Sequence, residues 1–301
     1  VSLYMIICGG WLHYSHHYTS RFNDDSMTHS LLLFVFLVGM AVSIVNASYE
    51  HAQYFAIGVI VQRLAYLAML HCLYVALYER CGIMTRNIMI VMMANMTLFG
   101  VMVLFPSSAW WLMPVLAFIE LFGEMSFISI PRTAMVPINI EHSKDRLGVL
   151  CLVMMGETII SITMEYREYM EKDVLTEDVE EAYYTLLALA FLLVFMFTLL
   201  YFHMQPPPAT HAFRRSGILG LATLVLHKLM GCSLLAVGVA IKVAVSAVVA
   251  KEQLTPFASR LLGIAVGSSM FNLLAMRRCH YGGRPKLDVS NFAHRLKNNW
   301  W

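Results

Sequence analysis

Charged side chains are scarce in this sequence. Asp, Glu, Lys and Arg make up 13% of the 301 residues, whereas apolar residues make up 59%. Soluble domains average about 25% charged and 45–50% apolar residues. The formal net charge is only +2, and the basic residues form no single stripe, so we expect no nucleic-acid partner. The composition predicts an all-α fold, a polytopic transmembrane helix bundle.

Sequence motifs for catalysis and cofactor binding are also lacking. The chain has no Gly-rich phosphate loop, no HExxH and no nucleophile elbow, so we expect no enzyme activity and no cofactor. Its six cysteines form no CxxC pair and no Cys/His ligand spacing, which indicates buried free thiols and no metal site. The apolar run at Val1 lacks a basic flank and is not typical of a signal peptide.

Apolar runs, in contrast, recur along the chain. Nine helical segments are predicted, and eight are long enough to span a bilayer. They cover residues 1–14, 27–47, 54–78, 87–105, 109–130, 147–164, 183–203, 218–250 and 256–276. We therefore expect about eight to nine membrane segments within a bundle of residues 1–276, followed by a basic polar tail of residues 277–301.

The charges of the loops predict an orientation. Loops after odd-numbered segments carry fourteen Lys and Arg residues, against four on the other side, Arg167, Lys172, Lys251 and Arg260. The fourteen are Arg21, Arg80, Arg86, Arg132, Lys144, Arg146, Arg214, Arg215, Arg277, Arg278, Arg284, Lys286, Arg295 and Lys297. By the positive-inside rule the C-terminus faces the cytoplasm, or the matrix or stroma of an organelle. The sequence does not choose between a plasma membrane and an organelle membrane.

Four ionisable residues are predicted inside the membrane at similar depth. Glu157 lies in GVLCLVMMGETIISITM, with ten residues between it and the cluster HSKDR, which places it about 15 Å into the bilayer. Arg63, Glu120 and His227 lie near the middle of other apolar runs. Intramembrane charges usually face a bundle interior and pair. We expect a charged centre in which Arg63 binds Glu157 and His227 exchanges protons.

Two stretches carry a resemblance to a known family. HSKDRLGVLCLVMMGETIIS and YTSRFNDDSMTHSLLLFVFLVGMAVSIV resemble motifs of the low-temperature-requirement A family of membrane proteins. The resemblance implies a divergent member, since Asn23, Ser30 and Asp145 depart from the family pattern. The family's opening helix has no counterpart and is either lost or lies upstream of Val1. The motif residues that carry over include Arg21, Asp25, His29, His142, Arg146 and Gly156.

The sequence leaves two functions open. The first is transport or ion translocation, with proton-coupled movement of a small solute through the charged centre as the favoured version. The second is a non-catalytic accessory subunit of a larger membrane complex, because buried ion pairs can also serve only to fix helix register. The expected partners are membrane lipids and, in the second case, other membrane subunits.

Overall fold

The computed structural model describes residues 1–123, 136–171 and 177–281, and these residues form helices and no strand. The predicted all-α membrane bundle is thus confirmed. The α-helices are α1 (Ser2–Leu12), α2 (Met27–Val45), α3 (Ala52–Ala76), α4 (Tyr78–Leu104), α5 (Ala109–Phe122), α6 (Ile140–Glu171), α7 (Glu177–Met204), α8 (Ala212–Arg215), α9 (Gly217–Val249) and α10 (Pro256–Tyr281). A π-helical turn, His13–Tyr18, extends α1.

Two helices begin well before their apolar runs. α4 starts at Tyr78 rather than at 87, and α6 starts at Ile140 rather than at 147. In α6 the polar residues of HSKDR continue the helix, whose first turn is capped by the Asn139 side chain accepting from the His142 N–H. α10 likewise passes the expected boundary at 276 and runs to Tyr281, and residues 282–301 of the expected tail lie outside the described residues.

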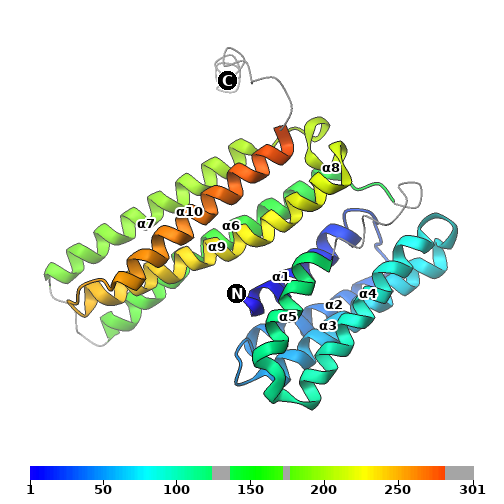
Figure 1. The fold of residues 1–301 in the computed structure, drawn as a ribbon, viewed down its shortest axis with the longest axis horizontal. Coiled ribbons are helices and arrows are strands. Elements are labelled where there is room, and N and C mark those ends of the chain that lie inside the picture. Colours follow the sequence, from blue (N-terminus) through cyan, green and yellow to red (C-terminus); the bar gives the residue numbers. More distant parts are fainter. Residues whose placement is uncertain (124–135, 172–176, 282–301) are drawn as a thin grey trace, which may run out of the picture.

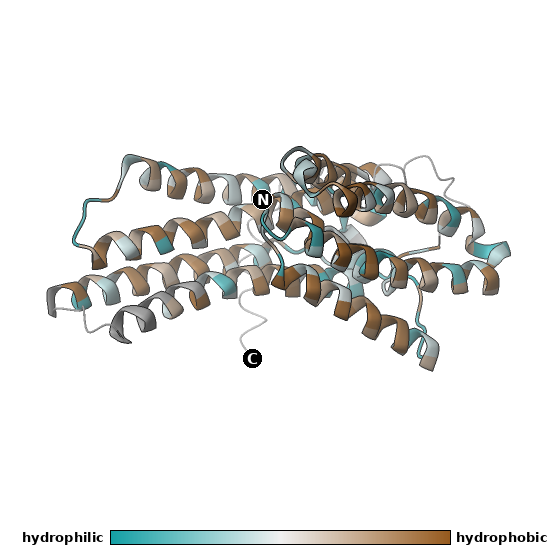
Figure 2. Ribbon diagram, turned by 90° about the horizontal axis from the view of Figure 1, so that it is seen from below, coloured by the Kyte–Doolittle hydropathy of each residue, from teal (hydrophilic) through white to brown (hydrophobic). Residues whose placement is uncertain are grey.

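Six of the helices are long and apolar enough to cross a membrane: α2, α3, α4, α7, α9 and α10. Large apolar side chains such as Phe34, Phe195 and Phe271 point outward from them. Figure 2 shows hydrophobic residues along most of the length of these helices. A surface of this kind suits lipid and not water. The protein is therefore an integral membrane protein.

The helices form two groups (Figure 1). α2, α3, α4 and α5 make one group, and α6, α7, α9 and α10 make the other, with α1 between them. Cys8 and Leu12 of α1 pack against Leu147, Leu150 and Leu224 of the second group. The Asn139 N–H also donates to the Ser20 carbonyl oxygen at 2.7 Å. α1 and its π-turn therefore join the two groups.

α2 and α3 pack with their backbones in close contact. A Cβ atom on Gly58 would lie 2.6 Å from the backbone nitrogen of Ser43, and one on Gly39 would lie 2.5 Å from that of Gln62. Small residues such as these two glycines let membrane helices approach each other closely. This contact holds α3, which carries Arg63, in its position.

Gly58→Ala is expected to lower the free energy of unfolding by about 1–3 kcal/mol, because a backbone atom cannot move aside for the new methyl group. Equilibrium unfolding in detergent micelles measures the change. Gly100→Ala on α4 is the matched control, since a Cβ there meets nothing within 4 Å, and it should stabilise by about 0.5–1 kcal/mol. Equal effects of the two substitutions would contradict the close α2–α3 contact.

His211 lies in the linker before α8 and is buried. Its ring centroid lies 4.5 Å from that of His280, and its Nδ1 accepts from the Phe213 N–H. Burial, reinforced by nearby His227 and Lys144, lowers the pKa of His211 to about 4. The folded protein therefore holds this imidazole neutral at a pH where the unfolded chain protonates it.

Stability should consequently fall as the pH drops below about 6.5 toward 4, because the unfolded state then binds the extra proton. Between pH 7 and pH 5 we expect His211 to account for a loss of about 2 kcal/mol. His211→Asn keeps an acceptor for the Phe213 N–H and does not titrate. Melting curves of this variant should show less pH dependence than those of the wild type, and identical pH dependence would refute the assignment.

Candidate charged centre

Glu120 on α5 is the acid at the middle of the bundle. It follows Leu112 and Leu116 on the buried face of the helix, at a spacing of four residues, and its side chain is 0% exposed. Arg63 Nη2 on α3 donates to Glu120 Oε1 at 2.5 Å, and Asn95 Nδ2 on α4 donates to the same oxygen at 2.6 Å. Three helices thus meet at one carboxylate.

α1 approaches the other carboxylate oxygen. His13 Nε2 lies 3.2 Å from Glu120 Oε2. A Cβ atom at Gly9, one turn before His13, would overlap that same oxygen. Glycine at this position is therefore what lets α1 come close enough for His13 to reach the acid.

The second helix group contributes Lys228 from α9. Its Nζ donates to the backbone carbonyl oxygen of Glu120 at 2.7 Å, and the residue is 0% exposed. The centre thus places one carboxylate beside a guanidinium, an ammonium and an imidazole. Cationic side chains of this kind can also hold a small anion, and because Arg63 and Lys228 come from different helix groups, any change in the charge of the centre is felt by both groups.

The expected pairing of Arg63 with Glu157 is wrong. Arg63 pairs with Glu120, while Glu157 is exposed on α6. No described residue forms a hydrogen bond or ion pair with Glu157. Arg63 and Glu120 are brought together as the sequence proposed, but Glu157 and His227 lie elsewhere.

Glu157 also lies at a different level of the bundle from the Arg63–Glu120 pair. Thr158 packs against Gly238, which lies ten residues beyond Lys228 on α9. Ten helical residues correspond to about 15 Å along α9, so Glu157 is displaced from the centre by that distance.

His227 forms a separate buried pair. Its Nδ1 lies 2.7 Å from the Thr223 carbonyl oxygen, and its Nε2 lies 3.1 Å from the Tyr201 hydroxyl. Because a carbonyl only accepts, Nδ1 carries the proton and Nε2 accepts from Tyr201. Both nitrogens are satisfied away from Glu120, so Lys228 and not His227 faces the centre.

The family-motif residues lie mostly at the end of the bundle that carries the 19–26 and 136–146 segments, here called the basic end. Arg21 donates to the Val136 carbonyl oxygen. His142 Nε2 lies 3.2 Å from Thr19 Oγ1 and 3.5 Å from Arg146 Nε. His29 Nε2 lies 3.3 Å from the Tyr14 hydroxyl, and Asp25 is exposed. Gly156 lies in α6, where a Cβ meets nothing within 4 Å.

Two partners of Glu120, His13 and Asn95, were not predicted, and of the neighbours His227 and Lys228 it is Lys228, not the predicted His227, that lies in the centre. The clearest sequence signal of this site was the run HYSHHY, which places three histidines directly after an apolar stretch, and all six of its side chains are buried. π-helical turns are rare and are frequent at functional sites. Among the described residues, no group of three His, Cys, Asp or Glu side chains could hold a metal ion.

The fold and this centre define a class of protein, the polytopic α-helical integral membrane proteins with a buried ionic centre. The comparison with family models is more specific. The family described as bacterial low temperature requirement A protein (LtrA) matches residues 1–293, and the chain belongs to this family. No curated protein and no solved structure matches it.

Proposed function

We propose that this protein moves protons across its membrane, coupled to a small solute, with Glu120 as the proton-exchanging acid. The observation that supports the proposal is a row of ionisable side chains from Glu120 to the basic end. Intramembrane ionisable residues in such rows are typical of proton relays in pumps and transporters.

The row follows the π-turn. His13 lies next to Glu120, and its ring centroid is 5.6 Å from that of His17. The rings of His17 and His16 are 5.0 Å apart, and His16 Nδ1 lies 2.6 Å from Ser143 Oγ at the start of α6. Small rotations of these rings would bring successive nitrogens within proton-transfer distance. The π-turn thus offers a proton route from the centre to the basic end.

The opposite direction is apolar. Between Glu120 and the start of α5, a cluster that includes Ile6, Phe99, Met102, Leu112 and Leu116 fills the space between α1, α3, α4 and α5. These apolar side chains have no group that could accept or donate a proton. The described residues therefore offer a proton route from Glu120 toward the basic end and not toward the start of α5, as one state of an alternating-access cycle would.

Some buried polar atoms of the centre have no hydrogen-bond partner among the described residues. Arg63 Nε and Nη1 are buried and have no hydrogen-bond partner among the described residues, and the same holds for Asn95 Oδ1. A purely structural ion pair would be expected to satisfy its donors. Unsatisfied donors beside an acid favour a site that takes up water or a solute during its cycle.

Proteoliposomes with an internal pH-sensitive dye test the proposal. An imposed pH gradient and a potassium–valinomycin potential should give a proton flux well above that of protein-free liposomes. Transport of solutes can then be screened for dependence on the gradient. No flux above the protein-free level, under any gradient or candidate solute, would reject the proposal.

One observation favours the accessory-subunit function instead. Glu157 stays exposed inside an apolar stretch of α6, between exposed Val153 and Ile160, where an unpaired carboxylate costs at least a few kcal/mol. A basic residue on a partner helix would offset that cost. Purification in mild detergent tests this function. A monomer or homodimer argues against it. Co-purification of another membrane protein at fixed stoichiometry, lost in the Glu157→Gln variant, supports it.

A further inference from the structure

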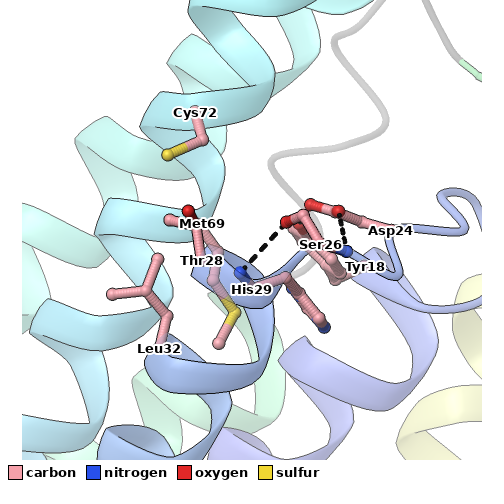
Figure 3. A pocket seen from close by; sticks show the side chains of 8 residues that line it. All are labelled: Tyr18, Asp24, Ser26, Thr28, His29, Leu32, Met69 and Cys72. Carbon is pink, nitrogen blue, oxygen red and sulfur yellow. Dashed lines mark hydrogen bonds between the residues drawn. The ribbon is translucent and has the colours of Figure 1, made fainter.

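A cavity of about 230 Å³ opens at the basic end, beside the π-turn. Tyr18, Asp24, His29, Leu32, Met69 and Cys72 contribute to its lining. Figure 3 shows that these side chains come from the segment before α2, the first turns of α2 and the last turns of α3. None of them belongs to the Glu120 centre.

The rim of the cavity is acidic. The Ser26 N–H donates to Asp24 Oδ1 at 3.0 Å, and the Tyr18 hydroxyl donates to Oδ2 at 3.4 Å. Hydrogen bonds from Ser26 keep the pKa of the Asp24 carboxyl below its ordinary value, so it is ionised at neutral pH. Asp25, the next residue, is exposed and does not line the cavity. Arg21 donates to the Val136 carbonyl oxygen, and no ion pair is seen between Arg21 and Asp24.

The interior of the cavity is apolar and aromatic. Leu32 and Met69 provide aliphatic surface. The rings of Tyr18 and His29 stack at 5.1 Å with an interplanar angle of 8°. His29 Nδ1 is buried and has no hydrogen-bond partner among the described residues. A bound molecule with a hydroxyl or amine group could provide one.

We propose that this cavity binds a small organic ammonium ion, with the ammonium group on Asp24 and a short carbon chain against Leu32 and Met69. A carboxylate beside aromatic rings is a favourable environment for an ammonium ion. The cavity lies below the ~300–1,000 Å³ of sites for drug-sized ligands, which limits the chain to a few carbons. Binding itself does not rest on the proposed proton transport; only coupling between the two would.

Alkylation of Cys72, an exposed residue of the lining, reports occupancy without any transport assay. The purified protein in phosphatidylglycerol nanodiscs is treated with a maleimide, and the Cys72 peptide is quantified by mass spectrometry. Butylammonium and ethanolamine should slow labelling at least tenfold at saturation. Butyrate and butanol, of similar size but without the positive charge, should leave the rate unchanged.

Three variants make the test specific. Asp24→Asn keeps an acceptor for Ser26 and should weaken protection by butylammonium at least tenfold. Asp25→Asn, on the same segment but outside the lining, should leave protection as in the wild type. Leu32→Trp fills the cavity and should abolish protection, while its melting temperature shows whether it is folded. Equal protection by butyrate or butanol, or full protection in Asp24→Asn, would overturn the proposal.

The ammonium group could belong to a free solute or to a lipid headgroup. Nanodiscs containing phosphatidylethanolamine distinguish the two sources. Protection without added amine assigns the site to the lipid headgroup, whereas protection only by added amine assigns it to a soluble compound. Both results support the ammonium site, and no protection by any of these compounds rejects it. The labelling assay does not measure proton flux, so an absence of protection would not contradict the proposed function.

Discussion

Glu120→Gln is expected to lower the free energy of unfolding by about 3–5 kcal/mol, as removal of one partner from a buried ion pair does. The wild-type centre holds one carboxylate against Arg63 and Lys228, both 0% exposed. Without that carboxylate, two buried cations remain with no acid from the centre beside them. Chemical denaturation in detergent micelles, followed by tryptophan fluorescence, measures the loss.

Adding Arg63→Met to Glu120→Gln should restore a large part of that stability. The double variant returns the centre to the net charge of the wild type, since Lys228 alone remains and still donates to the backbone carbonyl oxygen of residue 120. Glu157→Gln is the matched control on an exposed site and should not destabilise the protein. A double variant less stable than Glu120→Gln would show that the two side chains do not act as a pair.

Proton flux is expected to fall about 100-fold when Glu120 is replaced by Gln, the lower range for loss of a proton-transferring group. Gln accepts hydrogen bonds from Asn95 and Arg63 but cannot exchange a proton. Glu157→Gln, by contrast, should keep wild-type flux, because Glu157 is exposed and displaced from the centre. A normal flux with Glu120→Gln and a lost flux with Glu157→Gln would reverse the assignment.

The helices could be predicted because hydrophobic length is a local property. α9 and α10 were expected at 218–250 and 256–276, close to the observed Gly217–Val249 and Pro256–Tyr281. The early starts of α4 and α6 could not be predicted from the apolar runs, because a helix can begin in the polar residues that precede such a run. The π-turn at His13–Tyr18 was missed for a different reason: nothing in the residue types distinguishes it from an ordinary helical turn.

The centre was predicted only in part. Depth counted along each helix placed Arg63 and Glu120 near the middle of their segments. It does not show toward which side of the helix a side chain points. In α6 the buried face carries Leu147, Cys151 and Met155, and Glu157 falls off that face. In α5, Glu120 continues the buried stripe of Leu112 and Leu116. Because lipid-facing and core-facing residues are both apolar here, the sequence pattern could not separate these faces.

The charge of Glu120 is central to the account, and the double variant Arg63→Met with Glu120→Gln tests it most directly. This variant should be folded, so a loss of transport cannot be attributed to unfolding. In proteoliposomes under a pH gradient, we expect its proton flux to be no higher than that of protein-free liposomes. Wild-type flux from the folded double variant would contradict the account and leave the Arg63–Glu120 pair with a structural role alone.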